Sequence, residues 1–269
     1  RLEREQHRHE ITTSTNGREP QQRNIFRGAI RSQCTVTRHL KVQQSGSTYF
    51  ISPDAKTSDG LAEIAFDADQ LGQAGSIHGH ASGRAKAWFF TLNKTAMVLR
   101  HYQRGGLPAR LSADRYLWLG ITQSRPWREL NVLAKLYANN LPVPRPLGGR
   151  IVRTGAFYTA DIVTEQIPAS DTLADRLTQG WDDWWALGKT LKTFHTAGAG
   201  HADLNARNIL IDEQNGIWLI DWDRGQLRAS SAQQRASLKR LRRSLSREAA
   251  LDAAANKGWH ALLAGYQAF

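Results

Sequence analysis

The stretch from His201 to Asp221, HADLNARNILIDEQNGIWLID, constrains the fold more than any other part of this 269-residue chain. Its two short apolar runs, ILID and IWLID, predict strands, and the turn residues 213–216 between them predict a hairpin. Two acids, Asp203 and Asp221, and one amide, Asn208, flank these runs. Any fold that contains this stretch therefore brings two carboxylates and an amide to a single short hairpin.

These three residue types suit phosphoryl transfer, which needs an acid that orients the attacking hydroxyl and ligands for the metal ions that hold the nucleotide. Asp203 is the candidate catalytic base. Asn208 and Asp221 are candidate Mg²⁺ ligands, since that ion prefers hard oxygen donors. Intervals of 5 and 13 residues separate the three positions, as in the kinase pattern that begins H-R-D-L-x-x-x-N. The alternative is an exposed loop with an Asx-turn and a surface hairpin.

Apolar patterns divide the chain into a strand-rich part and a helix-rich part. Strands are predicted at 47–52, 88–90, 95–102, 149–153 and 157–167. A helix is predicted over 125–140, where Leu130, Leu133, Ala134 and Tyr137 share one face, and further helices follow at TLADRLTQG and 181–198. We therefore predict an α+β fold with a small antiparallel sheet lobe over 49–167 and a mainly helical lobe over 168–269. The tryptophans at 181, 184 and 185 are interpreted as helix packing.

Residues 1–48 are polar and weakly periodic, which indicates a disordered or accessory N-terminal extension. The chain has no uncharged apolar run of about 18 residues, so we expect no membrane span and a cytoplasmic location. Cys34 is its single cysteine, which excludes an internal disulfide and a thiolate cluster for zinc.

The net charge of +12 predicts an acidic partner, which nucleic acid, anionic lipid or a phosphorylated metabolite would satisfy. Residues 228–247 hold seven Lys or Arg and no acid, with Leu238, Leu241 and Leu245 on one helical face. This segment lies on anionic lipid with its leucines inward, packs its leucines on the core with its charges solvated, or does both. A second basic cluster precedes the 125–140 helix and either meets an anionic substrate or is solvated: Arg104, Arg110 and Arg115.

Several motifs together resemble the protein-kinase-like superfamily and, within it, the 3-deoxy-D-manno-octulosonic acid (Kdo) kinase family of Gram-negative lipopolysaccharide biosynthesis. The resemblance covers about 60–269 and rests on VLRHYQRGG (98–106), DRYLWLG (114–120), LPVPRPL (141–147), HADLNARNIL (201–210) and WLIDWDRG (218–225). It implies a two-lobed protein-kinase-like fold that uses ATP and Mg²⁺. It also implies phosphorylation of the 4-hydroxyl of Kdo on the glycolipid Kdo-lipid IVA, at the cytoplasmic face of the inner membrane. Neither nucleic acid nor a protein partner is implied.

The same resemblance assigns further residues to the nucleotide. Arg100 stands where protein kinases have a lysine, so we expect it to bind nucleotide phosphates, with Lys86 or Lys94 as alternatives. Glu129 is the acid expected to position it, and Gly83, with Gly79, the expected glycine of a phosphate-binding loop. The pattern G-x-G-x-x-G is absent.

Roles for the neighbouring loop residues are less constrained. We expect His201 to orient the catalytic loop, while Asp223 either binds a second metal or pairs with Arg224. Asn205 replaces the lysine of protein kinases, and no A-P-E motif follows Asp221, which points away from a protein substrate. Other small-molecule or aminoglycoside-type kinases, a pseudokinase, and a kinase-like module that binds nucleic acid remain as alternatives.

Overall fold

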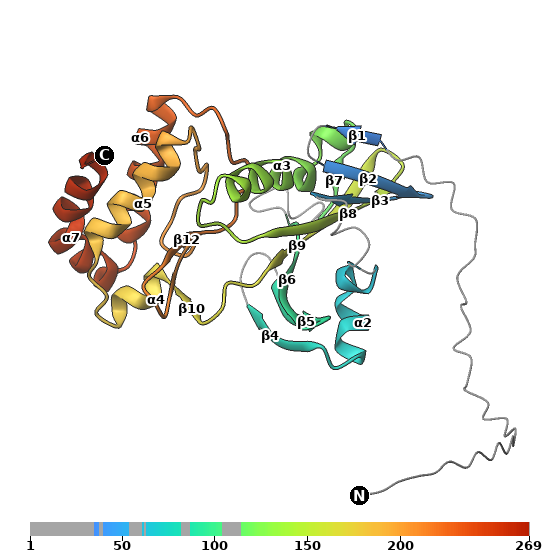
Figure 1. The fold of residues 1–269 in the computed structure, drawn as a ribbon, viewed down its shortest axis with the longest axis horizontal. Helices are drawn as coiled ribbons and strands as arrows, with labels where there is room; N and C mark the ends of the chain where they lie inside the picture. The colour runs from blue at the N-terminus through green and yellow to red at the C-terminus, as the bar shows by residue number, and fades with distance from the viewer. Residues whose placement is uncertain are drawn as a thin grey trace, which may run out of the picture. The chain divides into compact units, whose positions relative to one another are not determined.

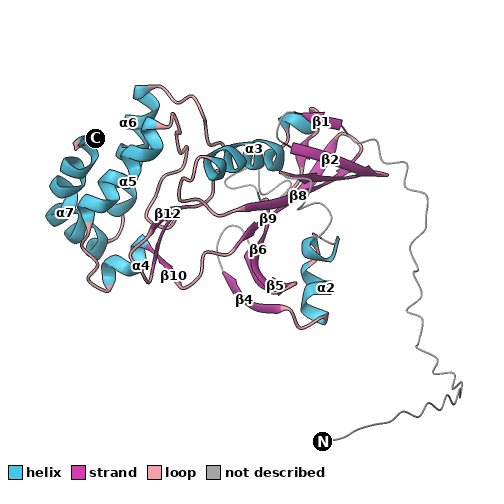
Figure 2. Ribbon diagram, viewed as in Figure 1, coloured by secondary structure: helices cyan, strands magenta, loops and turns pink. Residues whose placement is uncertain are grey.

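The structure, a computed structural model, describes residues 35–37, 40–53, 61, 63–81, 87–103 and 114–268, which fall within one compact unit, Ser32–Phe269. Strands dominate its first half and helices its second, which confirms the α+β class (Figures 1 and 2). Five residues named above lie outside the described residues: Cys34, Gly83, Lys86, Arg104 and Arg110.

Nine described strands form one sheet, ordered β1-β2-β3-β8-β9-β6-β5-β4, with β7 paired to β9. All its pairs are antiparallel. The strands are β1 (Thr35–Thr37), β2 (Leu40–Ser45), β3 (Thr48–Ser52), β4 (Ile77–Ala81), β5 (Ala87–Leu92), β6 (Thr95–His101), β7 (Tyr116–Leu117), β8 (Pro146–Thr154) and β9 (Phe157–Glu165). The predicted hairpin β5–β6 is confirmed. Asn93 and Lys94 close it with φ of 50° and 65°, the left-handed conformation that suits tight hairpin turns.

The sheet begins before the boundary predicted at residue 48. β2 pairs with β3 from Lys41 opposite Ser52 to Ser45 opposite Thr48, and Leu40 and Val42 are buried. Only these two apolar residues mark β2, because its other side chains lie on the outer face or near the turn. Two residues are too few for a period of two to stand out in a polar segment.

Helix α3 (Arg125–Ala138) packs against the sheet beside β8 and β9 (Figure 1). Pro126 near its first position favours a helix start. Leu130 and Leu133 are buried as predicted, but Tyr137 is 46% exposed and Leu136 is buried in its place. The inward face of the helix therefore rotates by one residue at its C-terminal end, where the chain turns toward β8.

The helical part begins after β9. A second antiparallel sheet, β10-β11-β12, contains β10 (Ser170–Thr172), β11 (Ile209–Asp212) and β12 (Ile217–Leu219). Its helices are α4 (Leu173–Thr178), α5 (Trp184–Thr196), α6 (Ser231–Leu245) and α7 (Ala249–Gln267). Shorter elements in the first half are η1 (Glu63–Phe66), α2 (Ala68–Gln73) and η3 (Ile121–Gln123).

Helices α5 and α7 touch backbone to backbone (Figure 1). A Cβ on Gly188 would lie 1.9 Å from the Leu262 carbonyl oxygen, and one on Gly265 would lie 2.1 Å from that of Trp185. Gly258 admits the ring of the buried Trp184 in the same way. The helix-packing interpretation is confirmed for Trp184, because its ring fills the space that the glycine leaves.

Helix α6 buries its leucines. Leu238, Leu241 and Leu245 belong to the main hydrophobic core, with exposures of 9%, 0% and 0%. Of the two alternatives for the basic segment, packing of the leucines on the core is therefore the observed one. Its basic side chains Lys239, Arg240 and Arg243 are exposed.

Candidate active site

The hairpin β11–β12 places the predicted metal ligands next to each other. Its turn is built on Asp212, whose carboxylate accepts hydrogen bonds from the Gln214 and Gly216 amides (2.9 and 2.7 Å) and from the indole of Trp218 (2.8 Å). At the open end, the Ile220 amide donates to the Asn208 carbonyl oxygen (3.0 Å). Asn208 and the residue before Asp221 are thus hydrogen-bonded neighbours.

His201 links the two loops that leave this hairpin. Its Nδ1 lies 3.2 Å from the Asp203 amide nitrogen and its Nε2 lies 2.9 Å from the Ile220 carbonyl oxygen. An amide can only donate and a carbonyl can only accept, so the ring is neutral with its proton on Nε2. Burial lowers the pKa of His201 below its ordinary value, in agreement with this state. The structure supports the orienting role predicted for this residue.

The buried ring of Trp222 anchors the loop of residues 221–223 to the core. Its ring is buried, lies 4.8 Å from His201 and 5.4 Å from Phe194 between ring centres, and donates its indole N–H to the Leu219 carbonyl oxygen. The residues on either side of Trp222 remain partly exposed. Burial of this one ring therefore holds Asp221 and Asp223 at the surface of the core.

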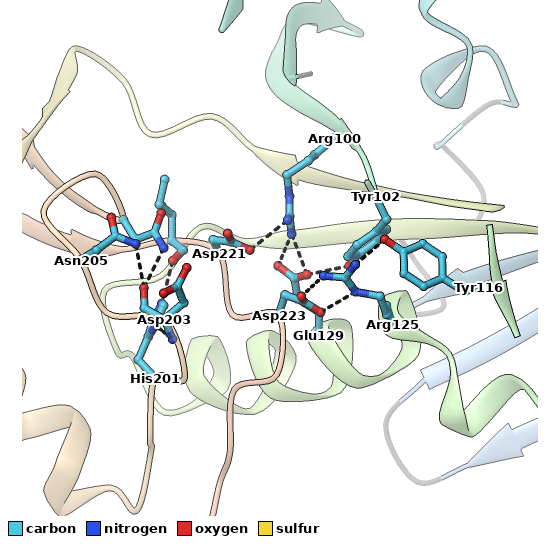
Figure 3. A network of polar contacts seen from close by, with 12 residues as sticks. Arg100, Tyr102, Tyr116, Arg125, Glu129, His201, Asp203, Asn205, Asp221 and Asp223 are labelled. Atoms are coloured by element: carbon cyan, nitrogen blue, oxygen red, sulfur yellow. Dashed lines mark hydrogen bonds and ion pairs between the residues drawn. The ribbon is translucent and has the colours of Figure 1, made fainter. Parts of the chain in front are cut away.

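The catalytic loop closes on the carbonyl oxygen of Asp203, which accepts from the side-chain amides of Asn205 and Asn208, each at 2.9 Å. Because Asn208 donates through Nδ2, its Oδ1 is left to face away from this contact. The loop thus leaves the Asn208 side-chain oxygen without a part in this hydrogen bond. Asn205 shapes the loop by its contact with Asp203 (Figure 3).

Arg100 joins three elements (Figure 3). From β6, it donates to both carboxylate oxygens of Glu129 on α3 (2.5 and 2.6 Å) and to Asp221 (2.9 Å). Asp221 has a φ of 60°, which is uncommon for a residue with a side chain and clusters at functional sites. The predicted pair of Arg100 with Glu129 is present. Lys94 instead lies exposed in the β5–β6 turn.

Glu129 is a buried carboxylate, 2% exposed, that also accepts from the Tyr102 hydroxyl (2.6 Å). Burial raises the pKa of Glu129 to about 6, against the opposing effect of Arg100. Burial alone would lower the pKa of Arg100, but Glu129 and Asp221 outweigh it and raise that pKa well above its ordinary value. Arg100 therefore stays charged, and Glu129 is ionised at neutral pH.

A second ion pair joins α3 to the loop of residues 221–225, and no sequence pattern predicted it. Arg125 donates through Nε to Asp223 (3.0 Å), pairs with it again through its terminal nitrogen, and contacts the Tyr116 hydroxyl. Asp223 therefore pairs with Arg125. The sequence-based prediction had named Arg224 as one possible partner instead. Arg125 and Glu129 stand four residues apart, a spacing that puts them on one helix face and that could have indicated a joint role.

A cavity of about 800 Å³ opens beside Arg100. Charged groups of Arg100, Glu129 and Asp221 line it together with the segment 164–167 that leads out of β9. Its apolar walls include Ala87, Val98, Ile162, Leu210 and Ile220. Further charged residues line its other side: Glu165, Asp171, Asp175, Arg176, Arg207 and Glu213. Its size is typical of cofactor-sized ligand sites.

Asp203 stands outside the buried network. Its side chain is 65% exposed, and Arg240 of α6 approaches one carboxylate oxygen to 3.8 Å. A second cavity, of about 670 Å³, lies between α3 and residues 223–227 and is lined by Arg128 and Arg224 among others. Gly79 lies in β4 opposite Phe89, as part of the sheet.

The arrangement unites an exposed acid, Asp203, the oxygen-bearing side chains of Asn208 and Asp221, and an arginine held by a helix glutamate beside a ligand-sized cavity. Together with the sheet lobe and helical lobe, this defines the chain as a protein of the kinase-like class. The chain belongs to the lipopolysaccharide kinase (Kdo/WaaP) family, whose model matches residues 69–266.

Relatives carry the same assignment. The chain is 43% identical over 201 residues to the 3-deoxy-D-manno-octulosonic acid kinase of Stenotrophomonas maltophilia, across 69% of this chain and 81% of that protein. It is 38% identical over 186 residues to the enzyme of the same name from Photobacterium profundum, across 68% and 79%. With that from Vibrio cholerae it shares 36% over 179 residues, across 65% and 76%. The chain is accordingly a kinase.

Proposed function

We propose that this chain transfers a phosphoryl group from ATP to the 4-hydroxyl of Kdo on the lipid A precursor Kdo-lipid IVA. The names of its relatives support the Kdo acceptor. The observation that carries the proposal is the position of Asp203, an exposed carboxylate on a loop whose backbone carbonyl holds Asn208, one hairpin away from Asp221. A group that takes a proton from a bulky acceptor must be reachable from solvent, whereas the nucleotide contacts lie in the cavity.

The cavity of about 800 Å³ is the proposed ATP site. Its apolar walls suit the base, and Arg100 supplies the cation for the phosphates. Glu129 and Tyr102 fix the direction of the guanidinium before the ligand arrives, which lowers the cost of ordering it on binding. Gly83, the proposed backbone contact for the phosphates, lies outside the described residues.

Asn208 and Asp221 fit a magnesium ion as ligands. Asn208 presents its oxygen because its nitrogen is engaged, and Asp221 has a second carboxylate oxygen beyond the one that meets Arg100. Among the described residues, no group of three or more His, Cys, Asp or Glu is placed to hold a metal ion. When bound, Mg²⁺ would neutralise charge that develops on the transferred phosphoryl group.

The acceptor is proposed to approach past α6. Arg240 lies beside Asp203 and can meet the carboxylate of the sugar acid in a forked geometry. As an exposed ion pair, Arg240 with Asp203 contributes little to stability, so the arginine is available to a ligand. Arg128 and Arg224 in the second cavity offer further cations to a phosphorylated glycolipid.

An acceptor that is a membrane lipid has to be phosphorylated at a membrane surface. We therefore propose that the chain is a peripheral protein at the cytoplasmic face of the inner membrane. No helix in the described part is long and apolar enough to cross a bilayer. The exposed cations of α6 within the basic 228–247 segment support attraction to anionic lipid, worth about 1 kcal/mol for each Lys or Arg at the surface.

Transfer of label from ATP to Kdo-lipid IVA tests the proposal. We expect Asp203→Asn to lower kcat by about 10²–10⁴-fold, because the amide cannot accept the hydroxyl proton. The melting temperature and ATP affinity should stay at their wild-type values, since the Asp203 side chain is exposed. Asp182→Asn, another exposed acid outside both cavities, is the control and should keep full activity. Wild-type turnover by Asp203→Asn would contradict the assignment of the base.

A further inference from the structure

Two charged side chains of the site have no part in the proposed transfer, Arg125 at the start of α3 and Asp223 in the loop of residues 221–225. They form an ion pair in which the side chains are only 22% and 14% exposed. Taking both charges out of water costs free energy, which their attraction repays only in good geometry, so stability alone is a weak reason for such a pair. A role in fixing one arrangement of the loop explains the pair better.

Arg125 is fixed at both its backbone and its side chain. Its guanidinium donates to both carboxylate oxygens of Asp223 and to the Tyr116 hydroxyl, and its backbone amide donates to the Tyr158 hydroxyl (3.1 Å). The guanidinium also lies over the rings of Tyr102 and Tyr116, 5.1 and 4.9 Å from their centres. Three tyrosines thus set the direction in which Arg125 meets the loop.

The loop of residues 221–225 has a backbone that needs support. Asp221 and Arg224 have φ of 60° and 64°, a left-handed conformation that costs about 1–2 kcal/mol for a residue with a side chain. The Gly225 amide donates to the Trp222 carbonyl oxygen (2.7 Å), and a Cβ on Gly225 would lie 2.8 Å from the Trp222 ring. A turn of this kind persists only where the surrounding groups hold it.

One arginine holds each acid of this loop (Figure 3). Arg100 donates to Asp221 from β6, and Arg125 donates to Asp223 from α3. Both guanidinium groups lie over the ring of Tyr102, which is 1% exposed, at 5.0 and 5.1 Å from its centre. A shift of either arginine therefore disturbs a buried ring that the other arginine also contacts.

We propose that Arg125 and Asp223 are positioning residues, which hold the loop of residues 221–225 against α3 and so keep Asp221 in the position of a metal ligand. The inference rests on the proposed role of Asp221 in binding magnesium. Trp222 anchors the loop to the core and Arg100 holds its first residue. The pair of Arg125 with Asp223 adds a polar attachment on the other side of the tryptophan.

The same geometry decides between the roles predicted for Asp223. Both of its carboxylate oxygens accept from Arg125, whereas Asp221 meets Arg100 through one oxygen only. A metal ion on Asp223 would have to share an oxygen with a guanidinium held beside it, and the two cations repel each other. Asp223 therefore acts through the loop and not on a metal ion.

A double substitution tests the positioning role without leaving one charge unpaired. Arg125→Met with Asp223→Asn removes both charges, whereas either change alone leaves its partner unpaired, which costs up to about 3–5 kcal/mol. Isothermal titration calorimetry measures the affinity for a non-hydrolysable ATP analogue, first with Mn²⁺ and then with the metal chelated. We expect the double variant to bind the Mn²⁺ complex about 10–100-fold more weakly, as is common when a group that orients a metal ligand is removed. Its affinity for the analogue without metal should stay at the wild-type value.

Two comparisons make this result specific. Arg125→Lys keeps the charge and can still meet one oxygen of Asp223, so it should recover part of the metal-dependent affinity. The double variant Arg242→Met with Asp252→Asn removes another partly exposed ion pair, between α6 and α7, and should bind the Mn²⁺ complex like wild type. Melting temperatures show whether each variant is folded.

Asp221→Asn separates this inference from the proposed function. If Asp221→Asn binds the Mn²⁺ complex like wild type, the proposed metal ligand is wrong and the inference falls with it. If Asp221→Asn binds it more weakly but the double variant at Arg125 and Asp223 binds it like wild type, the inference alone is overturned. The same holds if that double variant loses equal affinity with and without metal, because the pair then supports the fold and not the position of Asp221.

Discussion

At the scale of single residues, Arg100 is the feature that departs most from a protein kinase. Its guanidinium meets three carboxylate oxygens from two elements at once, two on Glu129 and one on Asp221. A planar fork with several donors can hold this arrangement, whereas a lysine ammonium is a single point of charge. The arginine thus holds α3 and the loop that contains Asp221 in one arrangement.

We therefore expect Arg100→Lys to lower kcat/KM for ATP by about 10–100-fold, although the charge is kept. The ammonium would retain contact with Glu129 or with Asp221 but not with both in the same geometry. Steady-state kinetics over a range of ATP concentrations measures the change, and Lys94→Arg in the exposed turn serves as the control. If Arg100→Lys is as active as wild type, the forked geometry has no part in nucleotide binding.

At the scale of elements, the contact between α5 and α7 depends on glycine. The two backbones lie so close together that a side chain would not fit between them. Gly188 on one helix and Gly258 and Gly265 on the other leave no room for a Cβ. Most of this contact consists of dispersion between close-packed atoms, which a small outward shift of one helix would reduce. The approach of the two helices therefore leaves room for nothing larger than glycine at these three positions.

Gly258→Ala should lower the free energy of unfolding by about 3 kcal/mol, because its methyl would lie 2.1 Å from the ring of Trp184. Gly72→Ala in α2 is the matched control, since its methyl meets only Ile77 at 3.9 Å. That substitution should be neutral or stabilise the protein by up to about 1 kcal/mol through helix propensity. Urea unfolding followed by circular dichroism compares the two. Equal effects of the two substitutions would contradict the close approach of α5 and α7.

At the scale of the whole molecule, stability should depend on pH through His195. This buried ring lies 2.6 Å from the Tyr266 hydroxyl and 3.1 Å from that of Ser237, so it ties α5 to α7 and α6. Burial, with a smaller effect of Lys192, lowers the pKa of His195 from 6.5 to about 4. The unfolded chain therefore binds a proton between these values that the folded chain does not, and stability is lost as pH falls below about 6.5.

This difference predicts that His195 makes the protein about 2 kcal/mol less stable at pH 5 than at pH 7. His195→Gln cannot take up the proton and should lose correspondingly less stability over the same interval, even if it is less stable at pH 7. Urea denaturation at both pH values gives the two differences. Identical losses for wild type and variant would mean that His195 titrates alike in both states.

The sequence predicted those parts of the molecule that are marked by a pattern of neighbouring residues. Hairpin β5–β6, helix α3 and the pair β11–β12 follow from apolar spacing and turn residues, and Asn208 pairs with Ile220, the neighbour of Asp221, because one hairpin connects them. β2 was missed since only Leu40 and Val42 mark its buried face. The pair of Arg125 with Asp223 spans 98 residues, and no local pattern reports a contact that only the packing of α3 creates.

The neutral ring of His201 has a consequence for the distance between two acids of this site. One imidazole spans the Asp203 amide and the Ile220 carbonyl, so the width of a ring, together with the backbone hydrogen bond from Ile220 to Asn208, sets the separation of the two loops. The far end of the hairpin has its own fastening, because the Asp212 carboxylate holds the Gln214 and Gly216 amides. The distance between Asp203 and Asp221 therefore depends on two polar side chains, one at each end of the hairpin.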